Sequence, residues 1–176
     1  HTFEGKLQGP MTAHPKIDPE TGEMLFFGYN ASGMISEDMS FHIVDKRGQL
    51  TRSETFKAPY AAMVHDFVVT REHVIFPIMP LTGSMERAMS GAPVYAWEPE
   101  VGVHVGIMPR AGTVADMRWF RGDIDGYVFH LMNAHTDGDI VTCDVCEFEQ
   151  APLFPAPDGT PGDPSKAVPR LTRWTF

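Results

Sequence analysis

The sequence has no long apolar run and is short of positive charge. No stretch approaches the roughly 18 to 20 consecutive apolar residues that a helix needs to cross a bilayer. Lysine and arginine number 14 against 23 aspartates and glutamates, which gives a formal net charge of −9. Binding to nucleic-acid phosphates requires clustered cations. We therefore expect no nucleic-acid partner, and residues 83–91 are too polar to predict insertion into a membrane.

Cysteine is also scarce, with only Cys143 and Cys146. On a strand, side chains three residues apart point to opposite faces, too far apart for a disulfide. No second C-x-x-C is present to complete a zinc ribbon. Two reduced thiols are typical of a cytoplasmic protein. The first residues include neither an initiator Met nor a signal-peptide core, so we expect residues 1–176 to be a single partial domain, an internal piece of a longer chain.

What the sequence does contain is a series of short runs rich in Val, Ile, Phe, Tyr and Thr, separated by turn residues. Such regular spacing indicates an all-β sandwich, barrel or propeller. Only residues 83–91 suggest a helix, of one or two turns, and the segment 152–169 is rich in Pro and Gly and predicts a loop. The predicted strands are residues 24–30, 39–45, 50–56, 63–70, 73–79, 102–108, 116–121, 127–135, 139–148 and 170–176.

A histidine lies in the middle of the predicted strand 63–70. Because side chains alternate along a strand, Met63, His65, Phe67 and Val69 would share one apolar face. An unpartnered imidazole is costly there, and a hydrogen bond to a backbone carbonyl would make His65 an ordinary core histidine. Similar histidines elsewhere that converge with it would instead indicate a metal site.

Two further histidines have comparable settings. Pro15 favours an extended conformation at His14, just before a tight turn, which is a suitable place from which to project into a cavity. His130 lies among apolar neighbours on the strand 127–135. A propeller would bring three such separate strands together, because its innermost strands line one axis. The spacing leaves a core role and a metal site both open, and imidazole suits zinc, iron, copper and nickel.

The remaining histidines are predicted to be structural. His42 and His104 alternate with apolar residues and are expected to face solvent, and His73 opens a strand after a turn. His135 is five residues beyond His130 and is expected to point to the opposite face of the strand. None of these four is predicted to be a ligand.

The sequence motifs around the three candidate ligands resemble those of a known family. Residues 12–23 (TAHPKIDPETGE) resemble the first iron-ligand motif of the carotenoid cleavage oxygenases, residues 63–67 with Thr70 resemble the second, and residues 129–134 (FHLMNA) resemble the third. Residues 108–110 with 118–120 are similar to a connecting segment of the family, and Arg173-Trp174 to a later strand. Within this family, the sequence most resembles the bacterial lignostilbene-dioxygenase branch.

This resemblance implies about three blades of a seven-bladed β-propeller with a non-haem Fe(II) on its axis. His14, His65 and His130 would be three of four histidine ligands, the fourth lying beyond Phe176. Acidic residues that orient the imidazoles through their other ring nitrogen are expected outside this piece. The implied reaction is cleavage of a conjugated C=C bond by O₂ in a small apolar substrate, a stilbene or an apocarotenoid, to give two carbonyl products.

Two alternatives follow from the residues alone. The chain could be a non-catalytic β-propeller module that binds partners and uses the three histidines as satisfied core groups. A three-histidine zinc hydrolase is a further possibility. Metal content and O₂ dependence would separate these readings from the Fe(II) dioxygenase.

Overall fold

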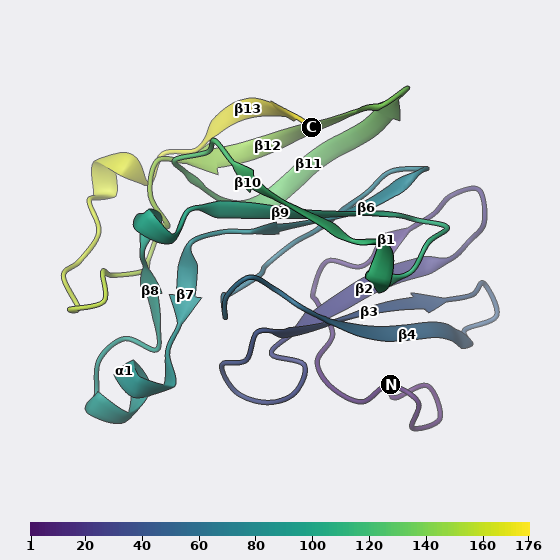
Figure 1. Cartoon of the computed structure of the whole chain (residues 1–176), viewed down its shortest axis with the longest axis horizontal. Helices are drawn as coiled ribbons and strands as arrows, with labels where there is room; N and C mark the ends of the chain where they lie inside the picture. The colour runs from purple at the N-terminus through teal and green to yellow at the C-terminus, as the bar shows by residue number, and fades with distance from the viewer.

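The computed structural model describes residues 1–176, which form three antiparallel sheets, a two-stranded ribbon and one short α-helix (Figure 1). The first sheet has the order β1 (Lys16–Ile17), β2 (Met24–Tyr29), β3 (Asp38–Val44) and β4 (Leu50–Lys57). The second has the order β10 (Arg118–Gly122), β9 (Val103–Pro109), β6 (His73–Ile78) and β5 (Val68–Val69). The third has the order β11 (Tyr127–Asp137), β12 (Ile140–Phe148) and β13 (Arg170–Thr175).

The second sheet lies between the other two and is apolar on both faces. Along β6, Val74 and Phe76 pack into a core shared with the first sheet, whereas Ile75 packs into a core shared with the third. This alternation explains the continuous apolar sequence HVIFPI, because a strand covered on both sides has no polar face. Sheets packed face to face in this way are consecutive propeller blades. The predicted all-β class with about three blades is confirmed.

The ribbon joins β7 (Leu81–Gly83) to β8 (Tyr95–Trp97) and carries α1 (Met85–Ser90) at its tip. Ser84 caps α1 by accepting a hydrogen bond from the Arg87 N–H, and Gly91 ends it in the left-handed conformation. The predicted one- or two-turn helix is therefore present. None of the helices has both the length and the apolar character required to span a membrane. Three short 3₁₀ helices, Pro99–Val101, Val114–Asp116 and Pro164–Lys166, lie in connections.

Most predicted strands are present within two residues of their expected ends, but the strand 63–70 is wrong. Only Val68 and Val69 form a strand with a neighbour; before them, Met63 donates its N–H to Leu81 of β7, and residues 64–67 belong to no strand. The predicted apolar face is also wrong, because Val64 and Asp66 are buried while His65 is half-buried. This segment leaves the ladder because it crosses from one sheet to the next. The three short strands β1, β7 and β8 were not predicted.

Two histidines expected to face solvent do not. His42 is only 1% exposed, because the N-terminal segment covers the outer face of the first sheet. Phe3 stacks on Phe26, which stacks on the His42 ring at 4.7 Å between centroids. His104 is half-buried and packs edge-on against Tyr60 at 5.7 Å. Strand alternation alone could not reveal these covers, since they come from segments distant in the sequence.

Candidate metal centre

Three imidazoles converge at the inner edges of the three sheets. The Nε2 atom of His65 lies 2.9 Å from Nε2 of His14 and 3.2 Å from Nε2 of His130. All three ligand atoms lie within 4.8 Å of one another. The ring centroids are 4.7 to 5.0 Å apart, and the rings are inclined to each other by 58 to 84°. The structure therefore brings together the three histidines that were predicted as ligands.

Hydrogen bonding between imidazoles does not account for this arrangement. A ring nitrogen has either one N–H or one lone pair, so the single Nε2 of His65 can satisfy only one of its two close neighbours. A metal ion can be bound by all three lone pairs at once. Imidazole–metal bonds of about 2.1 Å place two nitrogens at right angles about 3.0 Å apart, close to the separations found. The cluster fits a metal ion, and no Cys, Asp or Glu joins it.

His14 is presented by the chain just before β1. Pro15 fixes the extended course of the segment, and the side chain of Thr12 accepts a hydrogen bond from the His14 N–H at 3.1 Å. The Thr12 hydroxyl also lies 3.5 Å from the carbonyl oxygen of His65. Thr12 thereby links the backbones that carry two of the three histidines.

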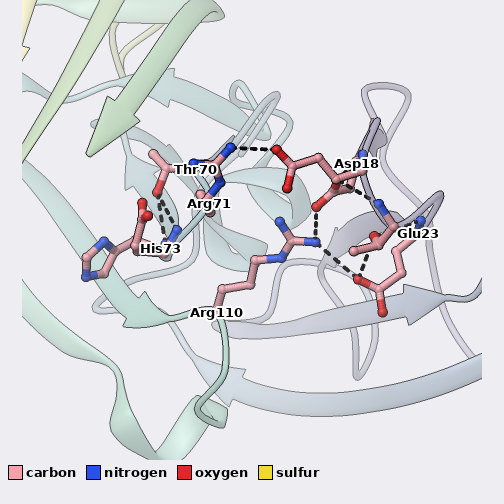
Figure 2. A network of polar contacts seen from close by, with 9 residues as sticks. Asp18, Glu23, Thr70, Arg71, His73 and Arg110 are labelled. Atoms are coloured by element: carbon pink, nitrogen blue, oxygen red, sulfur yellow. Dashed lines mark hydrogen bonds and ion pairs between the residues drawn. The ribbon is translucent and has the colours of Figure 1, made fainter. Parts of the chain in front are cut away.

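The turn that follows His14 is fastened to the second sheet by Arg110, the residue after β9. The Arg110 guanidinium lies 2.5 Å from the Asp18 carboxylate and 3.1 Å from that of Glu23, as Figure 2 shows. Backbone N–H groups at Glu20 and Thr21, followed by Arg110, lower the pKa of Asp18. The charged turn keeps the first sheet, and with it His14, in place against the second.

His65 lies in the crossing segment between the isolated bridge at Ala62 and β5. Phe129 packs edge-on against its ring at 5.4 Å, and Tyr127 packs against Phe129 at 4.7 Å. Burial, and then the neighbouring His14 and His130, lower the pKa of His65, while Asp66 opposes the shift. The neutral imidazole is the form that binds a metal. The side of His65 that faces the core shared by the second and third sheets is thus covered by aromatic rings, which exclude water.

His130 is the exposed member of the cluster and lies on β11, the edge strand of the third sheet. The pairing of β11 with β12 shifts register between Val128 and Leu131, and again between Leu131 and Asn133. Such bulges are common next to functional sites because they redirect a side chain. Of the three ligand candidates, only His130 lies within a strand, which corrects the expectation of three strands.

The other histidines lie outside the cluster, as predicted. His73 is half-buried with its Nδ1 atom 3.3 Å from the Thr136 hydroxyl. His42 has no partner for either ring nitrogen, and His104 has none for Nδ1. His135 is exposed on β11. No carboxylate contacts the free ring nitrogen of any candidate ligand among these residues, and the position of such acids stays a prediction.

One residue of the site was not predicted from the sequence. Asp66, only 5% exposed, pairs with Lys16 at 2.7 Å and accepts a hydrogen bond from the Leu131 N–H at 3.1 Å. A signal for it exists in the sequence, because a charged residue inside the apolar run 63–70 must have partners if it is buried. Its position directly after a candidate ligand is the second part of that signal.

Comparison with known proteins agrees with this geometry. The model of the retinal pigment epithelial membrane protein (RPE65) family matches residues 1–176. Isoeugenol monooxygenase of Pseudomonas putida is 52% identical over 93% of this chain and 34% of its own length. Lignostilbene-alpha,beta-dioxygenase isozyme III of Sphingomonas paucimobilis is 36% identical over 98% of this chain and 36% of its own length. The chain thus spans about a third of the curated relatives that it matches.

The fold comparison gives the same result. The crystal structure of lignostilbene dioxygenase from Pseudomonas brassicacearum superposes with a TM-score of 0.92 and 38% identity, covering 100% of this chain and 37% of that one. The predicted fold class, part of a seven-bladed β-propeller, and the predicted resemblance to the carotenoid cleavage oxygenases are both confirmed. The chain belongs to the retinal pigment epithelial membrane protein family, the family of the carotenoid cleavage oxygenases.

Proposed function

We propose that residues 1–176 are part of one larger propeller domain whose intact form is a non-haem Fe(II)-dependent oxygenase. His14, His65 and His130 would supply three of its iron ligands. The observation that carries the proposal is the convergence of three Nε2 atoms, with His65 at 2.9 and 3.2 Å from the other two. The names of the relatives support the oxygenase activity, since they include a monooxygenase and a dioxygenase.

The donor set fits Fe(II), in a site that differs from the common site of two histidines and one carboxylate. Neutral imidazoles leave the charge of a divalent ion uncompensated, and the carboxylate of the common two-histidine site is absent from the cluster. When bound there, Fe(II) supplies the redox chemistry that allows O₂ to react with an electron-rich double bond. The overall reaction adds both atoms of O₂ across one C=C bond and yields two carbonyl compounds.

The chain's own residues prepare the site in two ways. The lowered pKa of His65 keeps its imidazole neutral and able to bind the metal. The wall of Phe129 and Tyr127 keeps one side dry and apolar, which suits a flat conjugated substrate.

We infer that the substrate is a small phenylpropenoid or stilbene. The support is the 52% identity to isoeugenol monooxygenase and the 36% identity to a lignostilbene dioxygenase. An apocarotenoid is the other small conjugated substrate expected from the family resemblance. Assays of isoeugenol, a hydroxystilbene and an apocarotenoid side by side would rank the three classes by kcat/KM.

The experiment uses the intact protein, expressed from its complete reading frame and loaded with Fe(II) without oxygen. Iron per protein and O₂ consumption with isoeugenol and a hydroxystilbene are measured for His130→Ala. The matched control is His135→Ala, on the same strand and also exposed. We expect His130→Ala to lose stoichiometric iron and cleavage, and His135→Ala to keep both.

Three results would contradict the proposal. Stoichiometric iron and full cleavage in His130→Ala would show that the ligand assignment is wrong. Zinc as the resident metal, with no O₂ consumed in the presence of either alkene, would favour the zinc hydrolase instead. The absence of any bound metal from the carefully purified intact protein would favour a non-catalytic binding module.

A further inference from the structure

The buried carboxylate of Asp66 touches all three segments that carry the candidate ligands. It follows His65 directly in the chain. Its Oδ1 atom lies 2.7 Å from Nζ of Lys16, two residues after His14. Its Oδ2 atom accepts a hydrogen bond at 3.1 Å from the N–H of Leu131, the residue after His130. A single side chain therefore connects the three segments, through the Lys16 side chain and the Leu131 backbone, within two residues of each ligand.

These contacts pair a carboxylate that is buried, although the Lys16 side chain is 32% exposed. The Asp66 side chain is only 3% exposed, and a carboxylate taken out of water must be fully paired to be tolerated. Oδ1 accepts a second hydrogen bond, from the Phe67 N–H at 2.8 Å. Charge-assisted hydrogen bonds in such surroundings are shorter and stronger than neutral ones. The two cross-links to Lys16 and Leu131 resist displacement for the same reason.

The hydrogen bond from the Leu131 N–H to Asp66 has no counterpart in a regular sheet. β11 is the edge strand of its sheet, so some of its N–H groups face away from β12 and have no partner in the ladder. The register of β11 shifts on both sides of Leu131, which leaves the course of the strand at His130 less constrained by β12. Asp66 supplies the missing acceptor at this point.

We propose that Asp66 is a positioning residue, which fixes the three ligand-bearing segments in the arrangement that receives the metal. The inference rests on the metal site proposed above. Asp66 does not contact the ligand nitrogens and acts through the backbone and through Lys16. It therefore differs from carboxylates that orient an imidazole through its second ring nitrogen. Thr12 provides a weaker link of the same kind between His14 and His65.

The test is Asp66→Asn in the intact protein, which keeps the size of the side chain and removes its charge. Cobalt(II) chloride is titrated into the metal-free protein, and the visible absorption of the bound ion reports its coordination. We expect Kd for cobalt(II) to rise about 10- to 100-fold, the usual effect of removing a residue that supports metal ligands. The visible spectrum of the loaded variant should also differ from wild type.

Glu54→Gln is the matched control. Glu54 on β4 is a half-buried carboxylate that, like Asp66, pairs with a cation, Arg52 Nη2 at 2.6 Å, and accepts a hydrogen bond from a backbone N–H, that of Val114 at 3.2 Å. It contacts none of the three ligand segments. Its cobalt(II) Kd and spectrum should equal those of wild type, with circular dichroism confirming that both variants are folded.

Lys16→Met is the second variant, to be used if Asp66→Asn does not fold. It removes one cross-link and leaves the hydrogen bonds to Phe67 and Leu131, and a rise of about 10-fold in Kd is expected. An unchanged Kd and spectrum in a folded Asp66→Asn, or an equal loss in Glu54→Gln, would overturn the positioning role. Retention of cobalt(II) by His65→Ala would instead overturn the metal site itself, so the two failures are distinguishable.

Discussion

The two junctions between neighbouring sheets are built from different side chains. Between the first and second sheets the core is rich in phenylalanine: Phe76 contacts Phe27, Phe41 and Phe67 with ring centroids 5.8 to 6.1 Å apart. Between the second and third sheets valine is the commonest buried residue of the core, which also holds Cys143. Polar contacts cross both junctions: Arg110 pairs with Asp18 across the first, and Thr70 lies 2.8 Å from Thr136 across the second.

The apolar cores and the polar contacts at these junctions have different roles. Apolar contacts are non-directional and roughly proportional to buried area, so the phenylalanine core holds two sheets together without fixing them to fractions of an ångström. Hydrogen bonds and ion pairs have preferred distances and angles. At both junctions they lie near the segments that carry the three histidines. We therefore expect changes in the phenylalanine core to alter stability, and changes in the polar contacts to alter the site.

The largest effect is expected for Phe76→Ala in the first junction. Phe76 is fully buried, and removing such a ring costs about 3–5 kcal/mol in unfolding free energy. Urea unfolding of the intact protein measures it, with Phe76→Leu as the control that keeps most of the volume. The cobalt(II) Kd of the fraction that remains folded should equal that of wild type. A weakened Kd in that fraction would show that the apolar junction also positions the site.

A smaller and pH-dependent effect is expected on the outer face of the first sheet. Burial lowers the pKa of His42 to about 4 from its ordinary value of 6.5. Above pH 6.5 the ring is neutral in both states, but between about 6.5 and 4 the unfolded chain binds a proton that the folded chain does not. Stability should therefore fall by about 3 kcal/mol over that range from this group alone.

His42→Leu tests this, because it removes both partnerless ring nitrogens and the titrating group together. Unfolding free energies measured between pH 7 and pH 4 should fall less steeply than in wild type. At pH 7 the variant should be about as stable as wild type, since a buried polar group without a partner is itself costly. A decrease in unfolding free energy between pH 7 and pH 4 identical to that of wild type would show that His42 is not the group responsible.

The sequence predicts the parts of this molecule that local patterns determine. Strands such as β6 and β12 were placed within two residues, because alternation and β-branched residues are properties of the strand itself. The three histidines could be predicted because their neighbours form recognisable sequence motifs. His42 was misplaced because its cover, Phe3 and Phe26, involves a segment far away in the sequence. Asp66 was not predicted for the same reason, since its role depends on partners that are 50 and 65 residues away in the sequence.

The smallest effect is expected for Thr136→Val on β11. The change removes the hydroxyl that lies 2.8 Å from that of Thr70 and 3.3 Å from Nδ1 of His73. One hydrogen bond of this kind contributes about 1 kcal/mol to the unfolding free energy. Thr142→Val on the neighbouring strand β12 is the control, because it is also half-buried and its hydroxyl is not among the groups that bridge the two sheets.

The cobalt(II) titration then separates this cross-link from the one at Asp66. Thr136 lies six residues beyond His130 on the strand, so loosening the junction there should raise Kd less than Asp66→Asn does. The rise should be about 5-fold or less, which corresponds to the free energy of about 1 kcal/mol of the hydrogen bond itself. An effect as large as that of Asp66→Asn would mean that the whole polar junction positions His130. A lower unfolding free energy with an unchanged Kd would show that, of these two cross-links, only the one at Asp66 positions the metal ligands.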